Sequence, residues 1–301
     1  MGSTQADVAP DVVHVVNPVI LGLWGTMVAR QRDLPLLASY HTDITQYAHH
    51  LRLPFLIPIS RVFLRDVHNQ AHVNLCTSQP MVDKAEGLGI RRVRLWPKAV
   101  DTDLFHPDRR DGAMRERLSD GHPDAPLMLY VGRLSNEKQL DQVRPVLTTV
   151  PGTRLAVVGD GPARQDLAQH FAGTPTKFMG YLRDQELWSA FASADIFVFP
   201  SAMETFGLVL IEAMASGLPV VTTRVGGVDD MVQPGVNGYV FNVGDVRGMI
   251  DGVRAILSHP AKRMVMGRNA RLFAETQAWP AMMDELITCY DDLITGRTPR
   301  I

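Results

Sequence analysis

The segment from residue 195 to residue 223 constrains the fold more than any other part of the chain. It begins with a short apolar and aromatic run at 195–200, DIFVFP, which is typical of a buried parallel strand. The stretch METFGLVLIEAMA follows, and a break at Gly217 separates it from a second strand-like run at 220–223. This order predicts a βαβ unit whose loop opens at the carboxyl edge of a parallel sheet.

Strand-like and helix-like segments alternate along most of the chain. We expect strands at residues 12–16, 36–40, 73–76, 93–96, 127–131, 154–158, 177–179, 196–199, 219–222 and 239–241. Such alternation predicts an α/β protein with parallel sheets and helices on both faces. A linker-like stretch at 101–107 divides the strands into two series. We therefore predict one domain over residues 1–104 and a second over residues 105–278.

Two acidic residues frame the helix predicted to begin near Phe206 or Gly207. Glu204 precedes this helix, and Glu212 lies on it eight positions further along. Because eight residues span little more than two helical turns, the two carboxylates can reach one ligand from two sides. That arrangement suits a sugar nucleotide, although each residue can also be interpreted as a solvated surface acid.

Two cations follow the strand predicted at 127–131, in the stretch VGRLSNEK. Gly132 ends the strand, so Arg133 and Lys138 emerge on the next loop and helix start. Arginine forms bidentate hydrogen bonds with phosphate oxygens, and lysine acts as a mobile point charge. Two such cations at the carboxyl end of a strand therefore predict a site that binds a diphosphate from two sides, a diphosphate clamp.

Two other motifs are weaker signals. Gly159 and Gly161 follow a strand as in a dinucleotide fingerprint, but Arg164 stands at the third glycine position, which argues against a nicotinamide site. We expect these glycines to let the backbone approach the nucleoside or to close the turn. Asp101 and Asp103 spell a DxD triplet, but they lie in the linker, and a cationic clamp makes a metal unnecessary. We expect neither a metal nor a cofactor.

These segments, with SYHT at 39–42 and WPKAVD at 96–101, resemble the GT-B glycosyltransferases of the large retaining family 4. Within that family the chain is similar to sulfoquinovosyltransferases that make sulfoquinovosyldiacylglycerol. The likeness runs from about residue 10 to the last helix. It implies two Rossmann-like domains facing each other across a cleft, with residues 279–301 as a terminal helix that braces the first domain.

The resemblance implies transfer of a sugar from a nucleotide diphosphate sugar, with retention at the anomeric carbon. The groups that would stabilise charge on the departing diphosphate are Arg133, Lys138, Phe206, Gly207 and Leu208. Glu204 would hold sugar hydroxyls, and Glu212 would accept the ribose hydroxyls. His41 would line the cleft on the acceptor side and act in catalysis with Arg133, Lys138 and Glu204; its alternative is a neutral structural histidine.

The donor and the acceptor stay open at this point. The resemblance favours a UDP-sulfoquinovose-type donor and a lipid acceptor such as diacylglycerol. A GDP-mannose- or UDP-glucose-dependent enzyme with another acceptor is the alternative. Family members also begin with a strand, a glycine-rich loop and at least one more βα unit before the position of Pro10. On the order of 60 to 90 residues of the first domain are therefore expected to be absent. Exposed sheet edges and poor solubility would follow, and a non-catalytic nucleotide-binding remnant is a third possibility.

Composition sets limits on partners and compartment. A net charge of -2 gives no global attraction to nucleic acid, and Cys76 and Cys289 predict reduced, buried thiols in a cytoplasmic setting. The apolar stretch 12–29 lacks a preceding cationic segment, so we do not expect a signal anchor. Residues 47–69 mix apolar side chains with arginines, which suits peripheral contact with an anionic membrane; the alternative is a core helix with solvated arginines.

Overall fold

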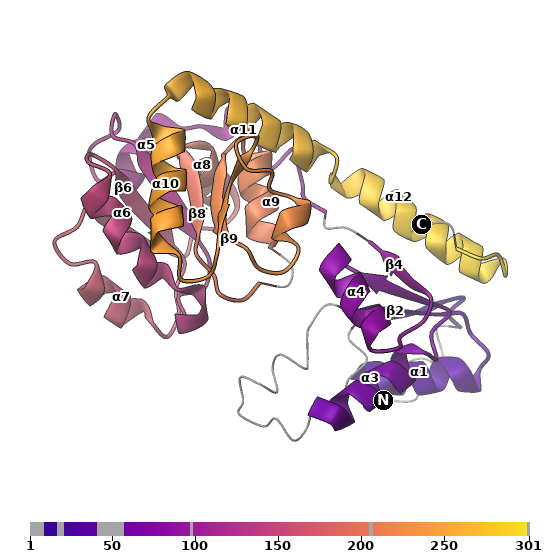
Figure 1. Cartoon of the computed structure of the whole chain (residues 1–301). Coiled ribbons are helices and arrows are strands. Elements are labelled where there is room, and N and C mark those ends of the chain that lie inside the picture. The colour runs from indigo at the N-terminus through magenta and orange to yellow at the C-terminus, as the bar shows by residue number, and fades with distance from the viewer. Residues whose placement is uncertain (1–8, 17–20, 41–56, 97–98, 205–206, 300–301) are drawn as a thin grey trace. The chain divides into compact units, whose positions relative to one another are not determined.

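The computed structural model describes residues 9–16, 21–40, 57–96, 99–204 and 207–299. They belong to two compact units. Unit 1 comprises Met1–Lys98 and Pro280–Ile301, and unit 2 comprises Ala99–Trp279. Each unit has its own sheet (Figure 1), and every strand pair among the described residues is parallel. The α/β prediction is confirmed.

Unit 1 contains a four-stranded sheet whose strands follow one another in chain order. These strands are β1 (Val13–Val16), β2 (Leu36–Tyr40), β3 (Val73–Cys76) and β4 (Val93–Leu95). The helices between them are α1 (Leu21–Gln31), α3 (Ile57–His68) and α4 (Gln79–Gly87). The crossovers all step in one direction. Parallel crossovers are right-handed as a rule, and right-handed crossovers that step in one direction place the helices on one face of the sheet.

Packing along β2 agrees with this arrangement. Leu36 and Ala38 pack in one cluster with Ala29 of α1, whereas Leu37 faces the other way. It packs against Leu286, Cys289 and Leu293 of the last helix, α12 (Trp279–Ile294). Side chains alternate between the faces of a strand, so α12 covers the face opposite to α1.

Specific hydrogen bonds attach α12 to unit 1. The indole Nε1 of Trp96 donates to the carbonyl of Met282 at 3.2 Å, and the Tyr290 hydroxyl lies 2.7 Å from Nδ1 of His14. The two cysteines, Cys76 and Cys289, are free and buried in unit 1. Burial raises the pKa of the Cys76 thiol to about 12 and that of Cys289 to about 11.

Unit 2 contains a six-stranded sheet in the order β10-β9-β8-β5-β6-β7. Its strands are β5 (Leu127–Val131), β6 (Arg154–Val158), β7 (Thr176–Gly180), β8 (Ile196–Phe199), β9 (Val220–Thr223) and β10 (Gly238–Phe241). Its α-helices are α5 (Gly112–Leu118), α6 (Arg144–Thr149), α7 (Arg164–His170), α8 (Asp184–Ala192), α9 (Leu208–Ala215), α10 (Val246–Leu257) and α11 (Pro260–Glu275).

Helices cover both faces of this sheet. Helix α6 contacts α10, whereas α8 contacts α5 and α9, and α9 contacts α11. The central strands β5 and β8 are therefore buried on both faces, which explains their nearly continuous apolar sequences, LMLYV and IFVF.

The boundary between the units differs from the one predicted at residues 104 and 105. Val100 pairs with Ala278 in an isolated parallel bridge: its amide donates to Gln277 at 3.0 Å, and its carbonyl accepts from Trp279 at 3.1 Å. Phe105 lies in the core of unit 2. These long-range contacts join the predicted linker to unit 2, and Pro280 onward belongs to unit 1.

Candidate functional site

The order of strands in unit 2 marks a topological switch point between β5 and β8. From β5 the chain steps to β6 and β7 on one side, then returns to β8 and steps to β9 and β10 on the other. In open α/β sheets, ligands bind in the crevice outside the carboxyl ends of strands at such a point. The segment that follows β5 contains Arg133 and Lys138, and the loop that follows β8 contains Glu204.

These two segments are joined by direct contacts. The backbone amide of Ala202 donates to the carbonyl of Glu137 at 2.9 Å. Lys138 Nζ lies 3.1 Å from Glu204 Oε2 and 3.5 Å from the carbonyl oxygen of Met203. The lysine ammonium also lies 5.1 Å from the ring centroid of Phe199, a cation–π distance. A cation and a carboxylate therefore meet across the switch point.

Helix α9 begins beside this ion pair. Its N-cap is Gly207, whose φ of 58° is in the left-handed region that glycine tolerates. Oε1 of Glu204 accepts a hydrogen bond from the Gly207 amide at 2.9 Å. The expectation that a helix starts near this glycine is thus met at Leu208, with a carboxylate at the positive end of the helix dipole.

Arg133 contributes charge rather than a contact to the described part of the site. Its side chain is exposed, and no ion pair or hydrogen bond of its guanidinium is present among the described residues. Burial alone would raise the pKa of Glu137. The Ser135 hydroxyl, at 2.5 Å, the backbone N–H of Glu137 and the charges of Lys138 and Arg133 together lower that pKa.

Sequence reasoning missed Glu137, although it lies inside the VGRLSNEK stretch. An acid flanked by two cations was the available signal. Its carbonyl holds the β8 loop through Ala202, and its charge, after burial, contributes to the raised pKa of Tyr130. The Tyr130 hydroxyl donates to the Arg133 carbonyl at 3.0 Å, which fixes the chain where it leaves β5.

Glu212 lies on α9 in a half-buried position. Burial raises the pKa of its carboxyl group to about 7. No hydrogen bond or ion pair of this side chain is present among the residues that the structure describes. A carboxyl group with a raised pKa and no such partner is suited to accept hydrogen bonds from the hydroxyl groups of a ligand.

At Gly159 and Gly161 the neighbouring backbone lies too close for a side chain. A Cβ at Gly159 would lie 2.0 Å from the carbonyl oxygen of Gly132, and one at Gly161 would lie 2.3 Å from that of Leu134. The amide of Leu134 also donates to the carbonyl of Asp160 at 3.0 Å. These glycines let the segments after β5 and β6 approach each other, a role that the sequence interpretation did not include.

The remaining predicted residues divide into two groups. His41 and Phe206 lie outside the described residues, so their positions stay predictions. Asp101 uses its carboxylate locally, accepting from the amides of Asp103 and Leu104 at 3.1 and 2.9 Å. Among the described residues no group of three or more His, Cys, Asp or Glu side chains is placed to hold a metal ion.

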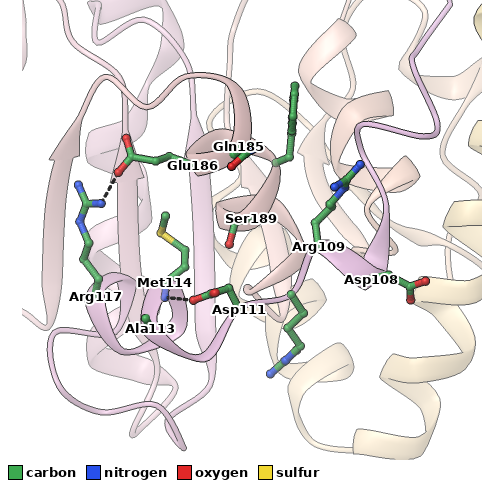
Figure 2. A pocket seen from close by; sticks show the side chains of 11 residues that line it. Asp108, Arg109, Asp111, Ala113, Met114, Arg117, Gln185, Glu186 and Ser189 are labelled. Atoms are coloured by element: carbon green, nitrogen blue, oxygen red, sulfur yellow. Dashed lines mark hydrogen bonds and ion pairs between the residues drawn. The ribbon is translucent and has the colours of Figure 1, made fainter.

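A surface hollow of about 560 Å³ lies along α5 and α8 (Figure 2), and none of the residues described above at the switch point lines it. Three of its charged side chains contact neighbouring residues. Arg117 pairs with Glu186 at 2.6 Å, and Asp111 caps α5 by accepting from the Met114 amide at 2.7 Å.

Comparison with known proteins decides the family. Residues 115–273 match the model of the glycosyl transferases group 1, and residues 4–104 match that of glycosyltransferase family 4. The chain belongs to the group 1 glycosyltransferases. The resemblance stated from the sequence is confirmed, as is the prediction of a glycosyltransferase at the level of the family.

Two curated relatives of this group 1 chain differ in the sugar that their names give. The chain is 37% identical to sulfoquinovosyl transferase SQD2 of Arabidopsis thaliana over 278 residues, which cover 90% of this chain and 54% of that protein. It is 34% identical to a GDP-mannose-dependent alpha-mannosyltransferase of Mycobacterium tuberculosis (strain CDC 1551 / Oshkosh), and the match covers 96% of this chain and 75% of that protein. The chain thus spans about half the length of the plant relative.

Solved structures establish the GT-B fold of this group 1 chain. Sucrose-phosphate synthase from Thermosynechococcus elongatus superposes with a TM-score of 0.83 at 24% identity, covering 98% of this chain and 76% of that one. Anabaena Alr3699/HepE in complex with UDP superposes with a TM-score of 0.80 at 20% identity, covering 95% and 80%. The prediction of two Rossmann-like domains is confirmed, and the first sheet has four strands among the described residues.

Proposed function

We propose that this chain transfers a sugar from a nucleotide diphosphate sugar bound at the switch point of unit 2. The observation that carries the proposal is the contact of Lys138 with Glu204 across the carboxyl ends of β5 and β8. A cation, a carboxylate and the first amides of a helix meet there. This combination matches the charges of a diphosphate and the hydroxyl groups of a sugar.

Each group has a role in the proposed reaction. Lys138, Arg133 and the amides that begin α9, at Gly207 and Leu208, stabilise the negative charge that gathers on the departing diphosphate. Preorganised donors of this kind lower the barrier because they need not reorient as charge develops. The charge on the sugar ring is oxocarbenium-like, and transfer occurs on the face that the diphosphate leaves, so the anomeric configuration is retained.

The two glutamates position the donor. Glu204 accepts sugar hydroxyls while its carboxylate stays beside Lys138, and Glu212 accepts the ribose hydroxyls. His41 orients the acceptor hydroxyl. No metal is required, because Lys138 and Arg133 neutralise the diphosphate. Gly159 and Gly161 shape the floor of the site by letting the neighbouring backbone segments come close.

For the donor we favour a UDP-sulfoquinovose-type nucleotide sugar, as the name of the plant relative suggests. GDP-mannose is the second candidate, because the mycobacterial relative has that specificity in its name and is almost as similar. UDP-glucose is a third, since a neighbouring solved structure is described as a complex with it. A non-catalytic nucleotide-binding protein is the remaining alternative.

We propose a lipid acceptor, such as diacylglycerol, reached by peripheral contact of unit 1 with an anionic membrane. Helix α3 exposes the apolar side chains of Ile59, Val62 and Phe63, with the exposed cation of Arg61 among them. Helix α1, on the same face of the sheet, exposes a second apolar row: Leu21, Trp24 and Met27. Exposed apolar rows combined with arginines suit the headgroup region of a bilayer.

Residues 47–56 of the basic apolar stretch lie outside the described residues, so this proposal rests on α3 and α1. None of the helices that the structure describes has the length and apolar character needed to span a bilayer.

Calorimetric titration with UDP, GDP and their sugars tests the donor, and product analysis with diacylglycerol tests the acceptor. We expect one nucleotide series to bind and the matching donor to yield a glycolipid with a retained anomeric configuration. Binding without turnover would favour the non-catalytic alternative. If no nucleotide bound and no product formed, the proposal would be wrong.

A further inference from the structure

The carboxylate of Glu204 contacts two hydrogen-bond donors that a bound diphosphate would also use, the ammonium of Lys138 and the amide of Gly207. One oxygen lies 3.1 Å from the ammonium of Lys138, and the other accepts the amide of Gly207 at 2.9 Å. In the proposed function, the Lys138 ammonium and the Gly207 amide both bind the phosphates of the nucleotide sugar. The following inference therefore rests on that proposed function.

The ion pair lies in a sheltered place. The side chain of Lys138 is 19% exposed and that of Glu204 is 16% exposed, and the ring centroid of Phe199 lies 5.1 Å from the ammonium. The surface pair of Arg117 and Glu186 is 48% and 54% exposed. Because screening by water is weaker at the sheltered pair, its electrostatic consequences for a nearby anion are larger.

We infer that Glu204 discriminates between the intact sugar donor and the nucleoside diphosphate that is left after transfer. A bare diphosphate must compete with the carboxylate for Lys138 and the α9 amide, and it brings a second anion close to Glu204. An intact donor brings the same phosphates together with sugar hydroxyls. Those hydroxyls donate to Glu204, whose oxygens can each accept more than one hydrogen bond.

This competition has a functional consequence. Loss of the sugar removes the hydroxyl groups that compensate the charge of Glu204, so the carboxylate then competes with the diphosphate for Lys138 and the Gly207 amide. The product diphosphate is then bound less tightly than the donor. Glu204 thus acts as a specificity-determining residue that favours exchange of spent nucleotide for fresh donor.

Calorimetric titration of the full chain with UDP, GDP and inorganic pyrophosphate provides the test. Glu204→Gln removes the charge but keeps an oxygen that can accept the Gly207 amide. We expect this variant to bind the preferred nucleoside diphosphate, and pyrophosphate, about tenfold more tightly than the wild type. The intact nucleotide sugar should gain much less affinity, so the ratio of the two affinities changes. Glu186→Gln, which removes a carboxylate from an ion pair far from the site, should change neither affinity.

Two further variants keep the failure of this inference separate from that of the proposed function. Lys138→Met should weaken binding of every diphosphate, whereas Lys177→Met, which breaks the exposed pair with Asp120 at 2.7 Å, should not. If Lys138→Met weakens binding but Glu204→Gln does not strengthen it, the site stands and the inference is wrong. If no protein binds any probe, both fail.

Folding of the variants is checked by thermal unfolding. Glu204→Asp serves as a second variant in case Glu204→Gln unfolds. Aspartate keeps the charge but is one methylene shorter, so it cannot span both Lys138 and the Gly207 amide. We expect it to bind diphosphates between the wild type and Glu204→Gln in affinity. Affinity equal to or weaker than that of the wild type in both variants would overturn the inference.

Discussion

Glu212 shows how position on a helix changes the chemistry of one carboxyl group. Burial raises its pKa from 4.5 to about 7. Between these two pH values the carboxyl group is protonated in the folded state and ionised in the unfolded chain. The stabilising effect of that proton is complete below pH 4.5 and is lost as the pH rises through 7.

Glu212→Gln should remove this dependence of stability on pH. We expect the free energy of unfolding of the wild type to fall, relative to the variant, by up to about 3 kcal/mol between pH 5 and pH 8. Urea unfolding at the two pH values measures this difference. A difference in free energy of unfolding between the two proteins that stays constant with pH would contradict it.

In the wild type, nucleotide affinity should rise as the pH passes 7, because the ionised carboxylate of Glu212 accepts hydrogen bonds from the ribose hydroxyls better.

At the scale of elements, close approach of two backbone segments depends on one glycine. Gly159→Ala places a Cβ 2.0 Å from the carbonyl oxygen of Gly132, so the segments after β5 and β6 must separate. We expect a loss of stability of about 3 kcal/mol or more, together with weaker nucleotide binding. Gly152→Ala is the matched control, since Gly152 also has positive φ but no atom near its Cβ position. It should cost about 1 kcal/mol in urea unfolding, and equal losses would argue against the clash.

The amino ends of β5 and β8 are held by a buried charge network, at the edge of the sheet opposite to the site. Asp195 accepts from Arg115 at 2.6 Å and from the Leu127 amide at 2.9 Å, and lies 3.3 Å from Arg263. Asp195→Ala would leave buried guanidinium charge without its partner. We expect a loss of about 3–5 kcal/mol in chemical unfolding. Glu186→Gln, at an exposed pair, should lose no more than about 1 kcal/mol. Similar losses in both variants would show that burial of the network is unimportant.

At the scale of the whole molecule, the two units have separate tasks in the proposed function. Unit 2 supplies the described groups of the nucleotide-sugar site, and unit 1 supplies the apolar rows of α1 and α3. If the second task is membrane contact, binding must depend on charge in unit 1 and not on charge elsewhere.

Flotation with vesicles tests that dependence. We expect the chain to float with vesicles that contain phosphatidylglycerol and to remain unbound with phosphatidylcholine alone. Arg61→Gln should weaken binding about fivefold, the value of one cation near an anionic surface. Arg247→Gln, at a highly exposed position in unit 2, is the control and should have no effect. Equal behaviour on both vesicles would refute the proposal, and concentration-dependent dimers without vesicles would assign the apolar rows to a second copy of the chain.

Much of the fold was predictable because the signals are local. Every strand expected from the sequence occurs within the described residues, with shifts of one residue at most at any end. Buried apolar runs such as 127–131 and 196–199, bounded by polar residues, glycine or proline, identify strands without knowledge of their neighbours. The pairing of Lys138 with Glu204 was only partly predictable, since the two motifs were recognised but not their direct contact.

The sequence by itself determined the strands, the start of α9 and the residue types that gather at the site, because propensity and side-chain chemistry are read from a few neighbouring positions. Only the tertiary structure decided the strand order, the raised pKa of Glu212, the reason for Gly159 and the network around Asp195. Each of these depends on contacts between residues distant in sequence, or on burial, which arise only when the sheet assembles.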